Sequence, residues 1–259
     1  MPRFAANLSM MFTDVPFLQR FERAAAAGFR AVEFLFPYDY SPGEVTQAAR
    51  AAGVEVVLFN TVPGDWSGGE RGLAALPGRE EEFRAGVARA LEYADALGCR
   101  QIHAMAGLVA AGADREAMRA TYVDNLRFAA ESASKTGVTV LIEPINTRDI
   151  PGFFLNYTEQ AAAIIAEIGA SNLKLQFDIY HRQVMQGDLT PAIETHLPLI
   201  AHMQIADTPG RNEPGTGEIN YSFLFAAIDR LGYAGWIGCE YRPRGETEAG
   251  LGWFRPYRG

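Results

Sequence analysis

The chain alternates strand signals with helix signals from one end to the other. Eight short runs of apolar residues are each followed by a segment long enough to form a helix. These runs are continuously apolar rather than alternating, which is typical of strands buried on both faces in a parallel sheet. Eight such units favour a closed (β/α)8 barrel of the α/β class, with residues 1–259 as one domain. The main alternative is an open, doubly wound sheet.

The predicted boundaries follow from the limits of the apolar runs and from the glycines that end many of the helices. We predict strands at residues 4–9, 31–36, 54–60, 101–106, 138–143, 173–178, 200–206 and 236–241. We predict helices at residues 16–27, 42–52, 79–97, 114–136, 158–168, 191–196, 221–231 and 247–254. A long glycine-rich loop, residues 61–78, separates the third strand from its helix.

The composition of the chain excludes several classes of function. A net charge of −8 offers no basic surface for nucleic acid, and no apolar run reaches the ~18 residues that a membrane span requires. The N-terminus lacks the apolar stretch of a secretory signal, and Cys99 and Cys239 form no disulfide framework, so we expect a reduced, cytoplasmic protein. Lys135 and Lys174 lie away from the strand ends where a barrel places its reaction, which argues against Schiff-base chemistry.

Polar residues stand at the C-terminal ends of the last four predicted strands, namely Glu143, Asp178, Gln204 and Glu240. These ends open on one face of a parallel barrel, so the four side chains can meet at one point. Three carboxylates and an amide oxygen form an all-oxygen shell, which suits Mg²⁺ or Mn²⁺. Any one of them alone is more often a helix cap, and arginine partners are another source of positive charge. Carboxylates within neighbouring apolar strands nevertheless favour a divalent cation.

The alternation of side chains along a strand supports this convergence. Leu141 falls on the same side of its strand as Glu143, and Gly238 on the same side as Glu240. We expect Gly238 to leave space beside Glu240, and Cys239 to point outward as a buried, inert thiol. Because Glu143 and Glu240 lie on the fifth and eighth strands, they can flank a substrate from opposite sides. Such a pair fits an isomerase that takes a proton from one carbon and returns it to the next.

The sequence around these residues resembles the hydroxypyruvate isomerase family of xylose-isomerase-like barrels. The resemblance covers nearly the whole chain, and its motifs include Leu-Ile-Glu-Pro-Ile-Asn at 141–146, Gln-Phe-Asp-Ile-Tyr-His at 176–181, His-Met-Gln-Ile-Ala-Asp at 202–207 and Glu-Pro-Gly-Thr-Gly-Glu-Ile-Asn-Tyr at 213–221. It implies a (β/α)8 barrel that interconverts hydroxypyruvate and tartronate semialdehyde (2-hydroxy-3-oxopropanoate). It further implies that Glu143 and Glu240 transfer the proton and that the four strand-end residues hold a divalent cation. Related sugar epimerases usually carry histidine at the position of Gln204, and an amide oxygen there favours Mg²⁺ or Mn²⁺.

Other parts of the chain resemble the 2-oxo-tetronate isomerase branch of the same family. These are the first forty residues and residues 235–245, whereas residues 143–153 look more like the hydroxypyruvate branch. Both reactions move a carbonyl between adjacent carbons of a hydroxy-keto acid, and the substrates differ in length by one carbon. We predict the hydroxypyruvate reaction, with 2-oxo-tetronate isomerisation as the alternative.

Five further residues are candidates for contacts with a small hydroxy-keto acid. His181, just after the sixth strand, can donate a hydrogen bond to a substrate oxygen or polarise the carbonyl. Arg211 can pair with the substrate carboxylate, and Asn7 can offer its amide. Trp66 and Arg71 lie in the glycine-rich loop, whose glycines permit hinge motion, and can cover the site. Each of these has a plainer interpretation as a turn cap, a surface side chain or part of a flexible connection.

Two other functions stay open as alternatives. A metal-dependent phosphodiesterase or endonuclease on the same barrel usually gathers several histidines around zinc, whereas this chain has four histidines and only His181 is well placed. A non-catalytic sugar-acid binding protein would have no use for two opposing carboxylates. We expect no nucleic-acid or membrane partner, and a homo-oligomer is left open.

Overall fold

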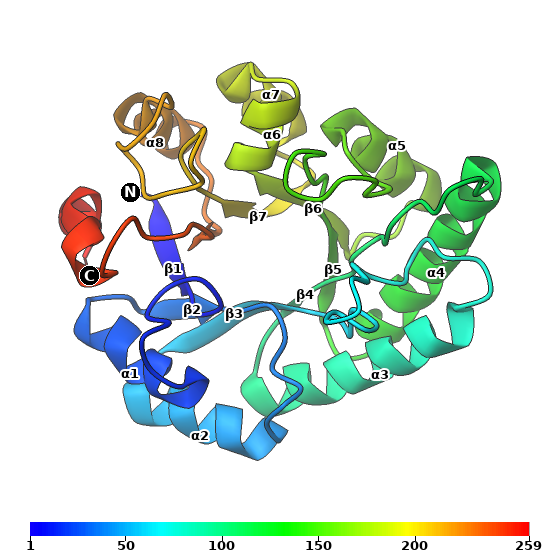
Figure 1. Ribbon diagram of the computed structural model, residues 1–259, viewed down its shortest axis with the longest axis horizontal. Helices are drawn as coiled ribbons and strands as arrows, with labels where there is room; N and C mark the ends of the chain where they lie inside the picture. The colour runs from blue at the N-terminus through cyan, green and yellow to red at the C-terminus, as the bar shows by residue number, and fades with distance from the viewer. Residues whose placement is uncertain (259) are drawn as a thin grey trace.

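The protein is described by a computed structural model over residues 1–258, and its eight strands form a closed barrel. The strands pair in chain order, every pair is parallel, and β1 pairs with β8 to close the ring. Figure 1 shows the strands at the centre and the helices around them. The prediction of an α/β barrel is confirmed, and the open-sheet alternative is wrong.

The elements lie close to the predicted ranges. The strands are β1 (Arg3–Asn7), β2 (Ala31–Glu33), β3 (Glu55–Asn60), β4 (Gln101–His103), β5 (Thr139–Ile142), β6 (Leu173–Asp178), β7 (Ile200–Gln204) and β8 (Trp236–Cys239). The helices are α1 (Phe17–Ala26), α2 (Pro42–Ala52), α3 (Glu80–Leu97), α4 (Arg115–Ser134), α5 (Thr158–Ile168), α6 (Ile179–Met185), α7 (Leu189–His196), α8 (Tyr221–Arg230) and the 3-10 helix η1 (Glu248–Tyr257). None of the helices in this described part of the chain is long and apolar enough to cross a bilayer.

Local sequence signals set the ends of α2, whose predicted boundaries match the structure. The Ser41 hydroxyl accepts a hydrogen bond from the Glu44 N–H, and the Glu44 carboxylate accepts one from the Ser41 N–H. Pro42 occupies the first turn, where its missing N–H costs nothing. Gly53 ends the helix in the left-handed region, at φ 68°.

The structure contains one helix that the sequence analysis did not predict. α6 begins directly after β6, and Asp178 caps it, because Oδ1 accepts hydrogen bonds from the N–H groups of Tyr180 (2.7 Å) and His181 (3.1 Å). No loop separates the strand from the helix, so the sequence carries no turn signal between them. Seven strands are also shorter than predicted, and the difference is largest for β2, which ends at Glu33, and β4, which ends at His103. The residues beyond these ends belong to the loops that surround the site.

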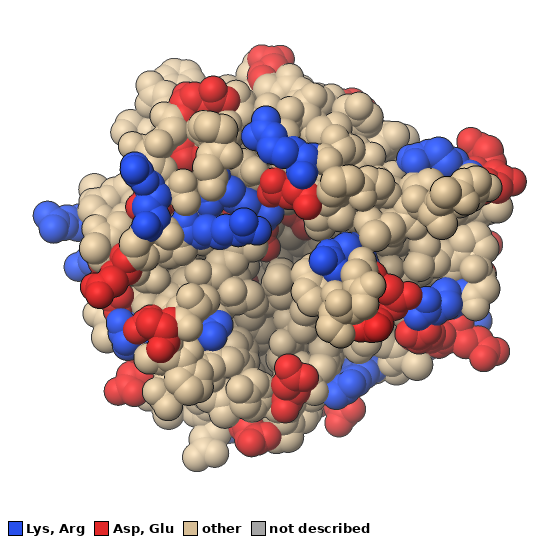
Figure 2. All heavy atoms as spheres, viewed as in Figure 1, with Lys and Arg blue, Asp and Glu red and all other residues tan. Residues whose placement is uncertain are grey.

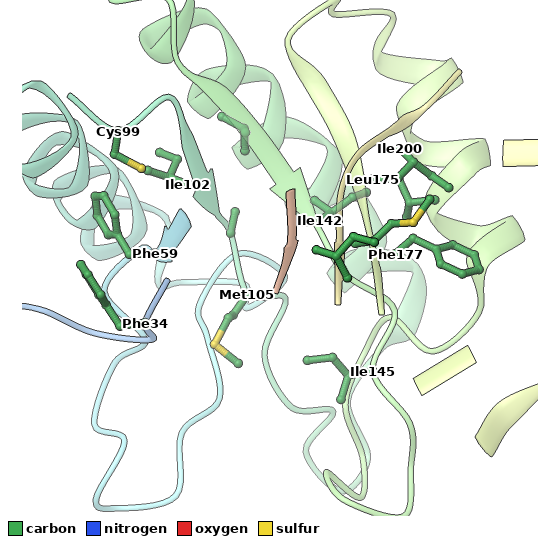
Figure 3. Packing of buried hydrophobic residues seen from close by; sticks show 14 of the residues in the cluster. Phe34, Phe59, Cys99, Ile102, Met105, Ile142, Ile145, Leu175, Phe177 and Ile200 are labelled. Carbon is green, nitrogen blue, oxygen red and sulfur yellow. The ribbon is translucent and has the colours of Figure 1, made fainter. Parts of the chain in front are cut away.

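The main hydrophobic core lies between the barrel and its helices. Figure 3 shows part of this packing around Phe34 and Phe59. Both side chains are buried, and their rings stack with centroids 6.0 Å apart. This layer fixes the strands against the helices and so fixes where the strand ends lie.

The interior of the barrel is apolar at one end and polar at the other. Ala5, Ala31 and Val57 form a small buried cluster separate from the main core. Two residues further along β1 and β2, on the same side of each strand, lie Asn7 and Glu33, both buried. The polar end is thus the C-terminal end of the strands, where barrels of this kind carry their sites.

Candidate active site

Four buried side chains meet at the C-terminal end of the barrel. Glu143 follows β5, Asp178 ends β6, His181 lies in the first turn of α6, and Glu240 follows β8. One ligand atom from each lies within 4.8 Å of those of the other three. The structure therefore brings together three of the four residues predicted as metal ligands, and adds His181 to them.

Two of these carboxylates each have one oxygen without a partner. Oε1 of Glu143 and Oδ2 of Asp178 are buried, and neither accepts a hydrogen bond from any residue between 1 and 258. Asp178 is both a helix cap and a member of the cluster, because Oδ1 caps α6 while Oδ2 lies 3.7 Å from His181 Nε2. Buried anionic oxygens require a proton or a cation. Hard oxygen donors beside an imidazole fit a divalent cation, so the residues present could hold one.

Glu240 has an arginine partner. Its Oε2 accepts a hydrogen bond of 2.6 Å from Nη2 of Arg211, which also donates from Nη1 to Asp149 at 2.8 Å. Arg211 is 9% exposed, and these two carboxylates pair with its guanidinium inside the protein. The sequence left open that arginines, rather than a cation, neutralise the strand-end carboxylates. An arginine pairs with Glu240, but none pairs with Glu143 or Asp178 among the described residues. Arg211 also lines the cavity, and its Nε makes no hydrogen bond with the described residues, so its contact with a substrate carboxylate stays a prediction.

Burial raises the pKa of all three carboxylic acids. The pKa of Glu143 lies well above its usual range because of desolvation, and the charges of Glu240 and Asp178 raise it further. Desolvation raises the pKa of Glu240 to about 8 and that of Asp178 to about 6, although the nearby Arg211 charge opposes both shifts. A carboxylic acid with a pKa near neutrality can both accept and release a proton at physiological pH.

His181 is held in one tautomer by Asn146. The Asn146 Oδ1 accepts a hydrogen bond from the Asp149 N–H (2.7 Å), which turns its Nδ2 donor toward His181 Nδ1 at 2.6 Å. The proton of the neutral imidazole is therefore assigned to Nε2, which lies 3.8 Å from Glu143 Oε1. Burial lowers the pKa of His181 well below its usual value, which keeps the ring neutral.

The amide oxygen of Gln204, the fourth predicted ligand, is engaged elsewhere. Gln204 Oε1 accepts a hydrogen bond of 2.7 Å from Gln176 Nε2, and its own Nε2 donates to Glu33 Oε1 at 2.8 Å. The side chain is buried at the end of β7, as predicted, but it bonds to its neighbours. It would have to exchange the Gln176 bond to reach a cation.

Glu33 is a buried carboxylate that the sequence analysis missed. It accepts hydrogen bonds from Asn7 Nδ2 (3.0 Å) and from Gln204, and lies 2.6 Å from His202 Nε2. Asn7 also approaches Glu240 Oε1 at 3.5 Å, so its amide lies among these carboxylates rather than along the cavity wall. A carboxylate inside the apolar run of the second strand was the signal that could have found Glu33, because the same criterion found Glu143.

Gly238 makes room for Glu33. A Cβ atom at Gly238 would lie 2.1 Å from Glu33 Oε2, far inside normal contact distance. The expectation that this glycine leaves space beside Glu240 is therefore corrected: the space exists, but the Glu33 carboxylate fills it. Cys239, next to it, is a buried free thiol, as predicted.

A cavity of about 200 Å³ opens above the cluster. Glu143, His181 and Glu240 form part of its lining, together with Trp66 and Arg71 from the glycine-rich loop. The Arg71 guanidinium lies 4.0 Å from the centroid of the Trp66 ring. Figure 2 shows the hollow at the centre of this face, with basic side chains on both sides of it. Two further lining residues that the sequence analysis did not single out are Asp149 and Arg242.

Comparison with known proteins assigns this barrel to a family. The family model described as "Xylose isomerase-like TIM barrel" matches residues 21–257, and the chain belongs to that family. Among curated proteins, the chain is 59% identical over 259 residues to the 2-oxo-tetronate isomerase of Cupriavidus necator, covering all of both chains. It is 53% identical over 258 residues to the hydroxypyruvate isomerase of Escherichia coli, again over the full length of both. The resemblance inferred from the motifs is confirmed.

Solved structures show the same fold. A crystal structure described as "AP endonuclease, family 2 from Brucella melitensis" superposes with a TM-score of 0.98 at 51% identity, over the whole of both chains. The structure of a 3-keto-D-glucoside 4-epimerase from E. coli superposes with a TM-score of 0.79 at 22% identity, covering 99% of each chain. The second likeness concerns the fold alone.

Proposed function

We propose that the protein is an isomerase that interconverts hydroxypyruvate and tartronate semialdehyde, with 2-oxo-tetronate isomerisation as the alternative. The observation that carries this proposal is the position of Glu143 and Glu240. Both line one cavity, both are buried, and burial raises the pKa of each above its usual range. The relatives that match over the full length bear the names of these two activities, which supports the same reaction type.

We assign the binding of a divalent cation to Glu143 and Asp178, with Glu240 and Gln204 as further ligands and His181 as a neighbouring hydrogen-bond donor. A bound Mg²⁺ or Mn²⁺ would polarise the substrate carbonyl and acidify the neighbouring C–H. The free oxygens of Glu143 and Asp178 support this assignment, since neither accepts a hydrogen bond from any described residue.

The two glutamates perform the proton transfer in this proposal. One carboxylate removes a proton from C3 of hydroxypyruvate, which leaves an enediol, and the proton is returned to C2. A second proton moves from the C3 oxygen to the C2 oxygen, so the product is the hydroxy-aldehyde acid and no atom is gained or lost. His181 Nε2–H faces the cluster and is suited to donate to the carbonyl oxygen. Arg211 holds Glu240 in place through Oε2.

The test is the replacement of each glutamate by its neutral isostere. Glu143→Gln and Glu240→Gln should each lower kcat by about 10²–10⁴, because the amide cannot accept the proton. Turnover of hydroxypyruvate and of 2-oxo-tetronate is followed by proton-exchange NMR with and without added Mg²⁺ or Mn²⁺. Glu131→Gln, on the exposed surface of α4, is the matched control and should keep full activity. Near-normal rates in either site variant would defeat the assignment, and preference for the longer acid would move it to the alternative.

The relative described as an AP endonuclease makes a metal-dependent phosphodiesterase the second candidate. The cluster contains one histidine, and His202, the next one along the barrel, is bonded to Glu33. The net charge of −8 also opposes binding to a polyanion. Metal analysis and a cleavage assay on DNA with an abasic site separate the two functions. Several zinc ions per chain together with strand cleavage would favour the nuclease.

A further inference from the structure

Three arginines line the cavity, and they are not equivalent. Arg211 is paired with Asp149 and Glu240, so its charge is balanced within the protein. Arg71 and Arg242 line the same cavity, yet neither makes an ion pair with any carboxylate that the structure describes. The cavity therefore presents two cations whose charge is left for a ligand.

Arg242 is anchored through its backbone and free at its side chain. It lies two residues after Glu240, beyond the end of β8. Its N–H donates to the Arg211 carbonyl at 2.8 Å, and its carbonyl accepts from Asn212 Nδ2 at 2.7 Å. The side chain is exposed at the cavity, and no described residue accepts a hydrogen bond from it. A fixed backbone with an unpaired guanidinium is a favourable arrangement for binding an external anion.

Arg71 is oriented by contacts that do not neutralise it. Its guanidinium stacks on Trp66, and Nη1 donates to the backbone carbonyls of Trp66 (3.1 Å) and Glu70 (2.6 Å). These contacts hold the group against the glycine-rich loop at the wall of the cavity. The remaining donors can therefore meet a carboxylate with little loss of side-chain entropy.

The positions of the unpaired arginines in the cavity fix which way a keto acid would lie. Arg71 and Arg242 line the cavity outside the buried cluster that contains Glu143 and Glu240, so they would attract the carboxylate of a substrate away from the two glutamates. We propose that Arg242, assisted by Arg71, binds the substrate carboxylate and thereby directs the hydroxy-ketone end toward Glu143 and Glu240. This inference rests on the proposed function and assigns to Arg242 the selection of acids over neutral sugars.

The experiment compares an acid with its neutral analogue. In dihydroxyacetone, a CH₂OH group replaces the carboxylate of hydroxypyruvate. Calorimetric titration of Arg242→Gln with hydroxypyruvate should give a Kd about 10- to 100-fold weaker than that of the wild-type protein, because charge-assisted hydrogen bonds are lost. Arg71→Gln should show a smaller loss in the same direction. The affinity for dihydroxyacetone, whether weak or unmeasurable, should be the same in the wild type and both variants.

Two further variants separate charge recognition from a structural effect. Arg242→Lys keeps the charge but not the fork of donors, so it should recover part of the affinity. Arg244→Gln removes an exposed cation that does not line the cavity and should leave the Kd unchanged.

The outcomes for binding and for turnover are distinct. An unchanged hydroxypyruvate Kd in Arg242→Gln, an equal loss for dihydroxyacetone, or no binding of hydroxypyruvate to the wild type would each overturn the inference. The wild-type protein could also bind hydroxypyruvate through Arg242 and yet show no isomerase activity. That result would overturn the proposed function, whereas the assignment of Arg242 as the carboxylate-binding residue would stand.

Discussion

At the scale of single residues, the Glu33 carboxylate occupies the space in the barrel interior that a side chain at position 238 would need. Glu33 accepts hydrogen bonds from Asn7 and Gln204, and it would overlap any side chain at position 238. Asn7 in turn approaches Glu240. The Glu33 carboxylate therefore supports the site from below without lining the cavity, and the glycine opposite it is required for that position.

Gly238→Ala should displace Glu33 and so disturb Asn7 and Gln204. We expect the free energy of unfolding to fall by about 1–3 kcal/mol, as for overpacking of a filled core, and kcat to fall as well. Urea denaturation and the isomerase assay measure the two effects. Gly245→Ala is the matched control, since a Cβ there meets nothing within 4 Å. Full stability and activity in Gly238→Ala would contradict this account of Glu33.

At the scale of elements, the glycine-rich loop after β3 is tied down at several points. The Glu70 carboxylate pairs with Arg79 at 2.6 Å and accepts the Asp65 N–H at 2.5 Å. Gly72, at φ 107°, approaches the backbone after β4 so closely that a Cβ atom would lie 2.3 Å from the Met105 carbonyl oxygen. We proposed from the sequence that the glycines act as hinges. At Gly72 the structure gives a different reason, which is close backbone packing.

Gly72→Ala should therefore move the loop that carries Arg71 and Trp66. We expect a loss of about 1–3 kcal/mol in the free energy of unfolding and a raised KM for the keto acid. Gly69→Ala is the control, because Gly69 also has a positive φ (101°) but nothing lies within 4 Å of a Cβ there. It carries the backbone strain without the collision. Equal KM values for Gly72→Ala and Gly69→Ala would show that the close approach does not position Arg71.

At the scale of the whole molecule, the buried carboxylates link folding to pH and to metal. Their pKa values are raised by burial in the folded state, to about 6 for Asp178 and about 8 for Glu240, and Glu143 shifts the same way. In the unfolded chain such groups titrate near pH 4. Between these values the folded protein binds more protons than the unfolded chain does, so the free energy of unfolding falls as pH rises.

The metal-free protein should thus be more stable near pH 5 than near pH 8. Mg²⁺ or Mn²⁺ should add stability chiefly at the higher pH, where the cation no longer competes with protons for the carboxylates. Urea denaturation from about pH 5 to about pH 8, with a chelator or with millimolar cation, measures both trends. Glu143→Gln should flatten the pH dependence. A metal-free protein whose stability rises over this range would refute the carboxylate shifts.

The fold was predictable because its signals are local. Apolar runs recur at every strand–helix unit and glycines end most of the helices, and a parallel barrel then brings Glu143, Asp178 and Glu240 to one end without further information. The pairing of Arg211 with Glu240 and the bond from Gln176 to Gln204 were not predictable, because they join side chains of different elements whose rotamers depend on tertiary packing. α6 was missed because Asp178 ends a strand and caps a helix at the same position.

The ring of strands also limits how copies of this chain can meet. Each of the eight strands has a neighbour on both sides, so none offers free backbone groups to a strand of another molecule. The folded barrel therefore cannot associate by adding strands of another copy to its sheet, and it cannot form fibrils in this way. Any homo-oligomer must form through the outer helices and loops, where Tyr157 and Phe223 are among the large apolar side chains that remain exposed.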